Sequence, residues 1–127
     1  MGSRSVPRSP DHPDPESGAG TLLMAGLAVL ALLLIASAAL LLQAAASASK
    51  AATAADLAAL AAADAARGIT SGDPCSAAGT VAQRHGAAVR ECSIGETGPG
   101  TAVVRVSVSG RGLLPDASGT ARAGPPP

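Results

Sequence analysis

Two cysteines and two histidines are the residues of this sequence best suited to chemistry. A thiol becomes a useful nucleophile when a base lies within hydrogen-bond reach, and His85 stands between Cys75 and Cys92 in the sequence. No glycine motif for an oxyanion site and no third orienting residue accompany them. The chain also lacks the bulky side chains that form a pocket. The sequence therefore predicts a protein that is not an enzyme.

The spacing of the other candidate ligands argues against a metal site. The cysteines lack the CxxC spacing of zinc sites, and His12 and His85 stand on opposite sides of a long apolar segment. Asp56 and Asp64, on a helix, would be separated by about 12 Å along the axis and roughly 80° around it, too far for a catalytic pair. We expect no metal, no cofactor and no small-molecule ligand.

Charge and composition narrow the class of protein further. The formal net charge is zero and 14% of residues are charged, so the chain lacks the basic field that nucleic-acid binding requires. The chain contains no Phe, Tyr or Trp, the residues that bury the largest areas in a core. We therefore expect no nucleic-acid partner and a thin hydrophobic core.

The cysteines have a structural use as a disulfide. A bond between Cys75 and Cys92 would close a loop of about 18 residues and contribute on the order of 3 kcal/mol. That is a large share of the stability of a domain without an aromatic core. The alternative is a pair of buried free thiols. We predict the disulfide Cys75–Cys92.

An apolar segment dominates the first half of the chain. No ionisable side chain occurs between Glu16 and Lys50, and residues 21–42 read TLLMAGLAVLALLLIASAALLL. As a helix this segment would reach roughly 33 Å, enough to cross a hydrocarbon core of about 30 Å. A buried helix of this kind would need a larger protein to cover it. We expect a single transmembrane helix and a location in the cell membrane.

A secretory signal peptide is the alternative interpretation of the same segment. Ala36 and Ala38, or Ala44 and Ala46, fit an A-x-A cleavage pattern, although signal peptides have apolar regions of only about 7–15 residues. Cleavage there would release the C-terminal half as an exported soluble protein.

The distribution of cations predicts the orientation of the span. Arg4 and Arg8 precede it, whereas Lys50 is the one cation within about 20 residues after it, so the N-terminus is expected in the cytoplasm. The cysteine pair agrees, because a disulfide persists in an oxidising compartment. The C-terminal domain is therefore expected to be extracytoplasmic.

The chain divides into three parts. Residues 1–18 are rich in proline and mixed charge and are expected to form a disordered cytoplasmic leader. Residues 19–67 form the transmembrane and extended helix, because no proline or glycine interrupts the stretch from Gln43 to Arg67 and Gly68 supplies a stop. The helix from 21 to 67 would be about 70 Å long. Residues 68–127 form a small extracytoplasmic domain with a disordered, proline-rich end.

The last domain is expected to be α+β. Asp73 and Pro74 are typical of the start of a short helix over 75–85, which Gly86 would end. Strands are expected over 88–94 and 102–109, since valines alternate with polar residues in the second. The helix would cover the valine face of a small antiparallel hairpin, or of a three-stranded sheet if residues 120–123 add an edge strand. The fold class is thus one long N-terminal helix, a short helix and a small antiparallel sheet.

The alanine-rich extension of the long helix admits two interpretations. In the first, Asp56 and Asp64 only keep the alanine-rich helix soluble in water, and Asp64 pairs with Arg67 at i+3. Alternatively, Asp56, Leu57 and Leu60 form an assembly surface, because the leucines make a narrow apolar ridge and the small residues around them permit close helix approach.

Three features in order resemble a known family. They are ESGAGT at 16–21 directly before the span, ADLAALAAA at 55–63 after it, and the later Cys75 and Cys92 with a valine strand and an Ala-Arg-Ala-Gly-Pro end. Over residues 16–127 this pattern resembles the TadE-like proteins, small pseudopilins of tight-adherence (Flp-type) pilus and secretion systems, in their short actinobacterial form.

The resemblance implies a prepilin-like precursor cut by a membrane peptidase on the cytoplasmic side between Gly18 and Ala19. It also implies other pilin-like or Tad secretion proteins as partners. Leu23 occupies the fifth mature position, where type IV prepilins carry glutamate. This departure favours a minor pseudopilin or an accessory membrane protein of the apparatus.

Overall fold

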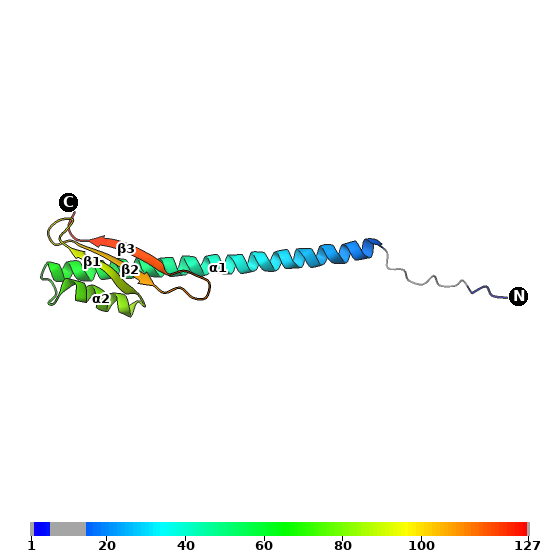
Figure 1. Cartoon of the computed structure of the whole chain (residues 1–127), viewed down its shortest axis with the longest axis horizontal. Coiled ribbons are helices and arrows are strands. Elements are labelled where there is room, and N and C mark those ends of the chain that lie inside the picture. The colour runs from blue at the N-terminus through cyan, green and yellow to red at the C-terminus, as the bar shows by residue number, and fades with distance from the viewer. Residues whose placement is uncertain (1, 6–14, 127) are drawn as a thin grey trace. The chain divides into compact units, whose positions relative to one another are not determined.

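The computed structural model describes residues 2–5 and 15–126 of the chain. It has an α+β fold with one long N-terminal helix, a short second helix and a three-stranded antiparallel sheet (Figure 1). The predicted fold class is confirmed. In chain order the elements are α1 (Pro15–Ala66), α2 (Pro74–Arg84), β1 (Ala88–Ile94), β2 (Ala102–Val108) and β3 (Ala117–Ala123).

Helix α1 is continuous over 52 residues. It begins at Pro15, earlier than the predicted helical part 19–67, because proline is well accommodated in the first helical turn, where its missing N–H has no helical partner. It ends at Ala66, within one residue of the predicted end. Gly68 adopts a φ of 71°, and the amide of Ile69 donates to the carbonyl oxygen of Asp64 at 2.9 Å, which closes the last turn. Most of the predicted leader lies outside the described residues.

The chain forms two compact units, Met1–Ala38 and Ala39–Pro127. In the first unit, residues 18–38 are all exposed, and so are Leu40, Leu41 and Leu42, the last leucines of the apolar segment, at the start of the second unit. Helix α1 is long and apolar enough over Gly18–Ala66 to cross a membrane. Complete exposure of so apolar a segment fits a lipid environment better than an aqueous one.

The sheet of the second unit has the strand order β1-β2-β3, with both pairs antiparallel. The third strand is longer than the predicted segment 120–123, because β3 pairs with all of β2, from Ala102 opposite Ala123 to Val108 opposite Ala117. Its first half contains Gly119 and small residues with low strand propensity, which is why the sequence pattern missed it. A bulge at Arg90, between Val89 and Glu91, interrupts the pairing of β1 with β2.

The hydrophobic core lies between the inner face of the sheet and the two helices, which Figure 1 shows running beside one another. The sequence assigned the valine face to α2 alone, but α1 supplies the larger share of the cover because α2 contributes only Ala78 and Ala82 to the core. The buried residues of α1 are all alanines: Ala51, Ala54, Ala55, Ala58, Ala59, Ala62, Ala63 and Ala65. The buried residues of β2 on this face are Ala102, Val104, Val106 and Val108.

Strand β3 approaches α1 so closely that their backbones nearly touch. A Cβ atom added to Gly119 would lie 2.5 Å from the carbonyl oxygen of Ala51 and 2.7 Å from its carbonyl carbon. Gly119 stands opposite Val106, and the same face of β3 carries only Ala117, Ala121 and Ala123 besides it. The alanine face of α1 therefore packs against a strand face made of equally small residues.

Helix α2 has the caps that the sequence predicts. Asp73 is the N-cap and its Oδ2 accepts a hydrogen bond from the amide of Ser76 at 2.9 Å, while Pro74 occupies the first turn. Gly86 follows the helix with a φ of 68°, which a residue with a Cβ rarely adopts. These caps set the two ends of α2, which packs against β1.

Gly119→Ala is expected to lower the free energy of unfolding of the second unit by about 1–3 kcal/mol, because the added methyl must displace the backbone of α1. The measurement is hydrogen–deuterium exchange of the β2 amides in the detergent-solubilised full-length protein, with faster exchange in the variant.

Ser118→Ala is the matched control, since Ser118 is the exposed neighbour of Gly119 on the outer face of β3. A surface change of this kind is expected to stay within about 0.5 kcal/mol of the wild type. Equal exchange rates in Gly119→Ala and the wild type would contradict the close approach.

Candidate functional site

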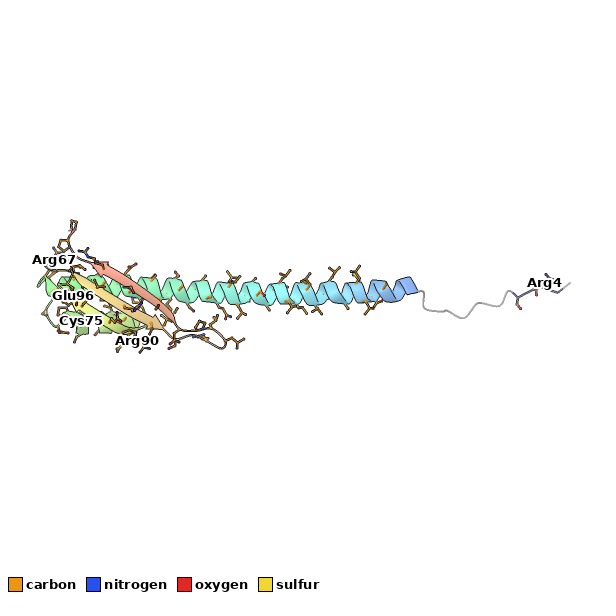
Figure 2. All side chains as sticks on the ribbon, turned by 45° about the horizontal axis from the view of Figure 1, so that its top comes forward. Arg4, Arg67, Cys75, Arg90 and Glu96 are labelled. Carbon is orange, nitrogen blue, oxygen red and sulfur yellow. A yellow bond between two sulfur atoms is a disulfide. The ribbon has the colours of Figure 1, made fainter. Side chains whose placement is uncertain are left out.

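The cysteines form a disulfide between the first turn of α2 and the middle of β1. The Cα atoms of Cys75 and Cys92 lie 5.9 Å apart, and the bond spans 17 residues of chain. Cys92 is the partner of Val104 on the neighbouring strand β2, and its side chain packs against the core. Figure 2 labels Cys75 in the folded unit, where it belongs to the first turn of α2. The bond ties α2, which buries only small side chains, to the sheet that it covers.

The disulfide also determines what chemistry the sulfur atoms can perform. Neither Cys75 nor Cys92 is a free thiol in this state. His85 is exposed and caps the other end of α2 from Cys75, about 15 Å away along the helix axis. Within residues 2–5 and 15–126, no group of three or more His, Cys, Asp or Glu side chains could hold a metal ion. His12 lies outside the described residues.

The alanine-rich part of α1 has its larger apolar side chains on the outside. Leu57 and Leu60 are 36% and 52% exposed, and Asp56 beside them is exposed as well. In an ordinary amphipathic helix the leucines would face the core and the small residues would face water. We call Asp56, Leu57 and Leu60 the leucine ridge. The structure places these three predicted site residues together on the face opposite the core.

The ridge follows the same side of α1 as the end of the apolar segment. Leu42 and Leu60 are 18 residues apart, which is five full helical turns at about 3.6 residues per turn, so they project in the same direction. Leu42 is 72% exposed. Leu42 and Leu60 therefore project from the same side of α1, with Ser49, Thr53 and Asp56 between them on that side.

The expected pair between Asp64 and Arg67 is absent. Within the described part of the chain, the ion pair formed is that of Arg105 with Glu91, at 3.6 Å on the sheet surface. The aliphatic part of Arg67 instead packs against Gly100, after β1, because the close approach of sheet and helix brings the two together. Asp64 is half-buried, and its carbonyl oxygen accepts from the amides that end α1.

The predicted processing site lies in the first turns of α1. Gly18 and Ala19 are both helical and both exposed, and no other part of the described chain lies near the Cα of Gly18. Their accessibility is what a peptidase substrate needs. Cleavage between them stays a prediction.

The outer face of the sheet carries three arginines that the sequence analysis did not assign. Arg90 donates from Nε to Ser107 Oγ at 2.6 Å, and Arg122 donates from Nε to Thr97 Oγ1 at 2.9 Å. Arg105 pairs with Glu91. The alternation of valine with polar residues in β2 indicated an exposed face that includes Arg105. Arg90 and Arg122 could not be assigned to that face from the sequence, because the bulge at Arg90 and the full length of β3 were not predicted. These hydrogen bonds stay within the sheet and its loops, so they order its surface.

No protein-family model, curated protein or solved structure significantly matches this chain. The functional interpretation therefore depends on the residue pattern and on the geometry described above.

Reduction of the disulfide is expected to destabilise the second unit by about 3 kcal/mol, because it releases a loop of the size that Cys75 and Cys92 close. The measurement is amide exchange of β1 and α2 in the full-length protein, with and without a reductant.

The double variant Cys75→Ala, Cys92→Ala is the control for direct effects of the reductant. Its exchange should equal that of the reduced wild type and should not respond to reductant. A wild type whose exchange is unchanged on reduction would show that packing alone holds α2 in place.

Proposed function

We propose that this chain is a TadE-like minor pseudopilin or accessory membrane protein of a tight-adherence (Flp-type) pilus or secretion apparatus, which acts by helix–helix assembly. The observation that carries the proposal is the leucine ridge. The alanine part of α1 buries its smallest residues and exposes its largest apolar ones.

The energetics of this arrangement support an outward partner. Burying a leucine side chain is worth about 1.5–3 kcal/mol relative to leaving it exposed, and the isolated chain realises only part of this gain for Leu57 and Leu60. The residues around the ridge are small, which allows another helix to approach closely. A like helix from another pilin-like subunit fits both properties.

The proposed location is the cell membrane, and the length and apolar character of α1 support it. The apolar segment would cross the cell membrane once, with Arg4 and the N-terminus in the cytoplasm and the folded unit outside. The disulfide Cys75–Cys92 supports this orientation, because such bonds persist in oxidising compartments. A prepilin peptidase would then reach Gly18 and Ala19 from the cytoplasmic side. Leu23 in place of glutamate is the reason for proposing a minor or accessory role.

One observation favours the alternative, an exported soluble protein released by signal peptidase. The buried face of α1 begins at Ala51, whereas Ala44 and Ala46 are exposed. Cleavage after Ala46 would therefore leave the whole core intact. The two candidates differ in where the mature chain begins.

The N-terminal sequence and intact mass of the protein from native membranes and culture medium test the processing. We expect a membrane-bound chain that begins at Ala19, because the peptidase would act at the cytoplasmic end of the span. A soluble chain that begins between Ser37 and Lys50 would instead establish the exported protein, and an intact N-terminus would refute cleavage at Gly18.

The double variant Leu57→Glu, Leu60→Glu tests the ridge. We expect association with partner subunits to weaken about tenfold or more in the double variant, since burial of the exposed parts of the two leucines is worth roughly 1.5–2.5 kcal/mol together. The measurement is native electrophoresis of complexes extracted from native membranes, where the higher-order species should disappear.

Ile69→Glu is the matched control, because Ile69 is 62% exposed but lies beyond the end of α1. It should leave the complex unchanged. Amide exchange of β2 should stay at the wild-type rate in both variants, which separates lost assembly from lost folding. A complex that survives the double variant would exclude the ridge as the assembly surface.

A further inference from the structure

The loop between β2 and β3 extends along α1 toward the apolar segment, past the end of the sheet (Figure 1). Arg111 and Leu114 of this loop line a hollow whose other wall is formed by Gln43, Ala46 and Ser47 of α1. The apolar segment ends one residue before Gln43. Ser47 is five residues after Leu42, which is about 8 Å along the helix axis at a rise of about 1.5 Å per residue. The loop therefore lies beside the part of α1 that directly follows the apolar segment.

This distance corresponds to the headgroup layer of a bilayer. The hydrocarbon core is about 30 Å thick and the whole bilayer about 40–45 Å, so each headgroup layer is roughly 5–8 Å deep. If residues 21–42 fill the hydrocarbon, the β2–β3 loop is at the depth of the lipid headgroups.

The loop carries the most exposed large apolar side chain in the described part of the chain. Leu113 is 92% exposed. The turn that holds it is ordered by two hydrogen bonds, from the amide of Gly110 to Asp116 Oδ1 at 2.9 Å and from the amide of Leu114 to the carbonyl oxygen of Arg111 at 3.1 Å. Leu113 is thus presented by a structured turn.

Cations surround the same end of the folded unit. Lys50 borders the hollow beneath the loop and also a second hollow, which Arg84 and His85 line at the end of α2. Arg111 adds a further cation in the loop. Neither hollow is lined by an acidic side chain. We call Lys50, Arg84, Arg111 and Leu113 the basal surface.

We propose that the basal surface docks on anionic phospholipid headgroups of the membrane that α1 crosses. Leu113 enters the apolar side of the interface, and Lys50, Arg84 and Arg111 face the lipid phosphates, a combination typical of interfacial anchoring. The inference rests on the membrane-spanning part of the proposed function and not on pilus assembly. Docking would hold the folded unit against the membrane and limit the directions in which the leucine ridge can face.

The composition of the chain allows a direct test. The protein contains no Trp, Tyr or Phe, so Leu113→Trp creates a single emitter in the full-length chain. We expect blue-shifted emission, strongly quenched by lipids with brominated acyl chains, in phosphatidylglycerol vesicles. Ile69→Trp, 27 residues beyond Leu42, should emit as in water and escape quenching.

The role of the cations is tested in the same background. Arg111→Gln combined with Leu113→Trp should reduce the ratio of docked to free loop about fivefold in anionic vesicles, the factor expected for one cation at such a surface. In phosphatidylcholine vesicles the two proteins should be quenched equally. Equal quenching in both lipids, with no effect of Arg111→Gln, would overturn the binding of anionic headgroups.

Leu32→Trp, in the middle of the apolar segment, separates the two proposals. Quenching of Leu32→Trp without quenching of Leu113→Trp would overturn the docking alone, whereas an unquenched Leu32→Trp would overturn the membrane anchor and the docking together. Blue-shifted emission of Leu113→Trp that brominated lipids do not quench would assign the loop to a protein contact and overturn docking on lipid.

Discussion

The close contact between the alanine face of α1 and the inner face of the sheet is the constraint on which the folded unit depends. With no aromatic residue available, each buried side chain offers few atoms for dispersion contacts, which fall off steeply with distance. The chain compensates by bringing backbones together, as Gly119 does against Ala51. The buried valines lie on the central strand, where Val104 and Val106 are fully buried, and the buried residues of α1 and α2 that cover them are alanines. Small residues on the helices and β3 and larger ones on β2 therefore fill the core in a complementary way.

This packing explains why the leucines of the alanine segment face outward. A leucine on the inner face of α1 would hold β3 away from the helix and open a gap along the alanines that flank it. Leu57 and Leu60 are compatible with the fold only on the far side, where they remain available to a partner. The same constraint explains the disulfide, because α2 contributes just Ala78 and Ala82 to the core and needs a covalent tie to β1.

Local signals in the sequence were sufficient to predict most elements but not their packing. Asp73 and Pro74 predict the start of α2, and the alternating valines predict β2, because caps and period-two patterns are local. The core face of α1 gives no comparable signal, since nearly every residue from 44 to 66 is small and the pattern has no contrast between faces. The sequence could therefore propose the leucine ridge but could not show that the alanines opposite it form the core. The position of the β2–β3 loop beside Gln43 could not be predicted for another reason, because it depends on how far β2 and β3 extend along α1.

The exposed leucines bear on the choice between an assembled membrane protein and a released soluble one. A single exposed leucine is ordinary on any soluble surface and carries little weight by itself. Here, however, Leu60 projects from the same side of α1 as Leu42, and the exposed Leu113 belongs to the loop whose Arg111 and Leu114 share a hollow with Gln43 and Lys50. A chain released after Ala46 would carry these side chains into water with neither a neighbouring helix nor a lipid surface to cover them. The proposed membrane-anchored and assembled form would cover them, and this difference is the physical reason for proposing it over the released form.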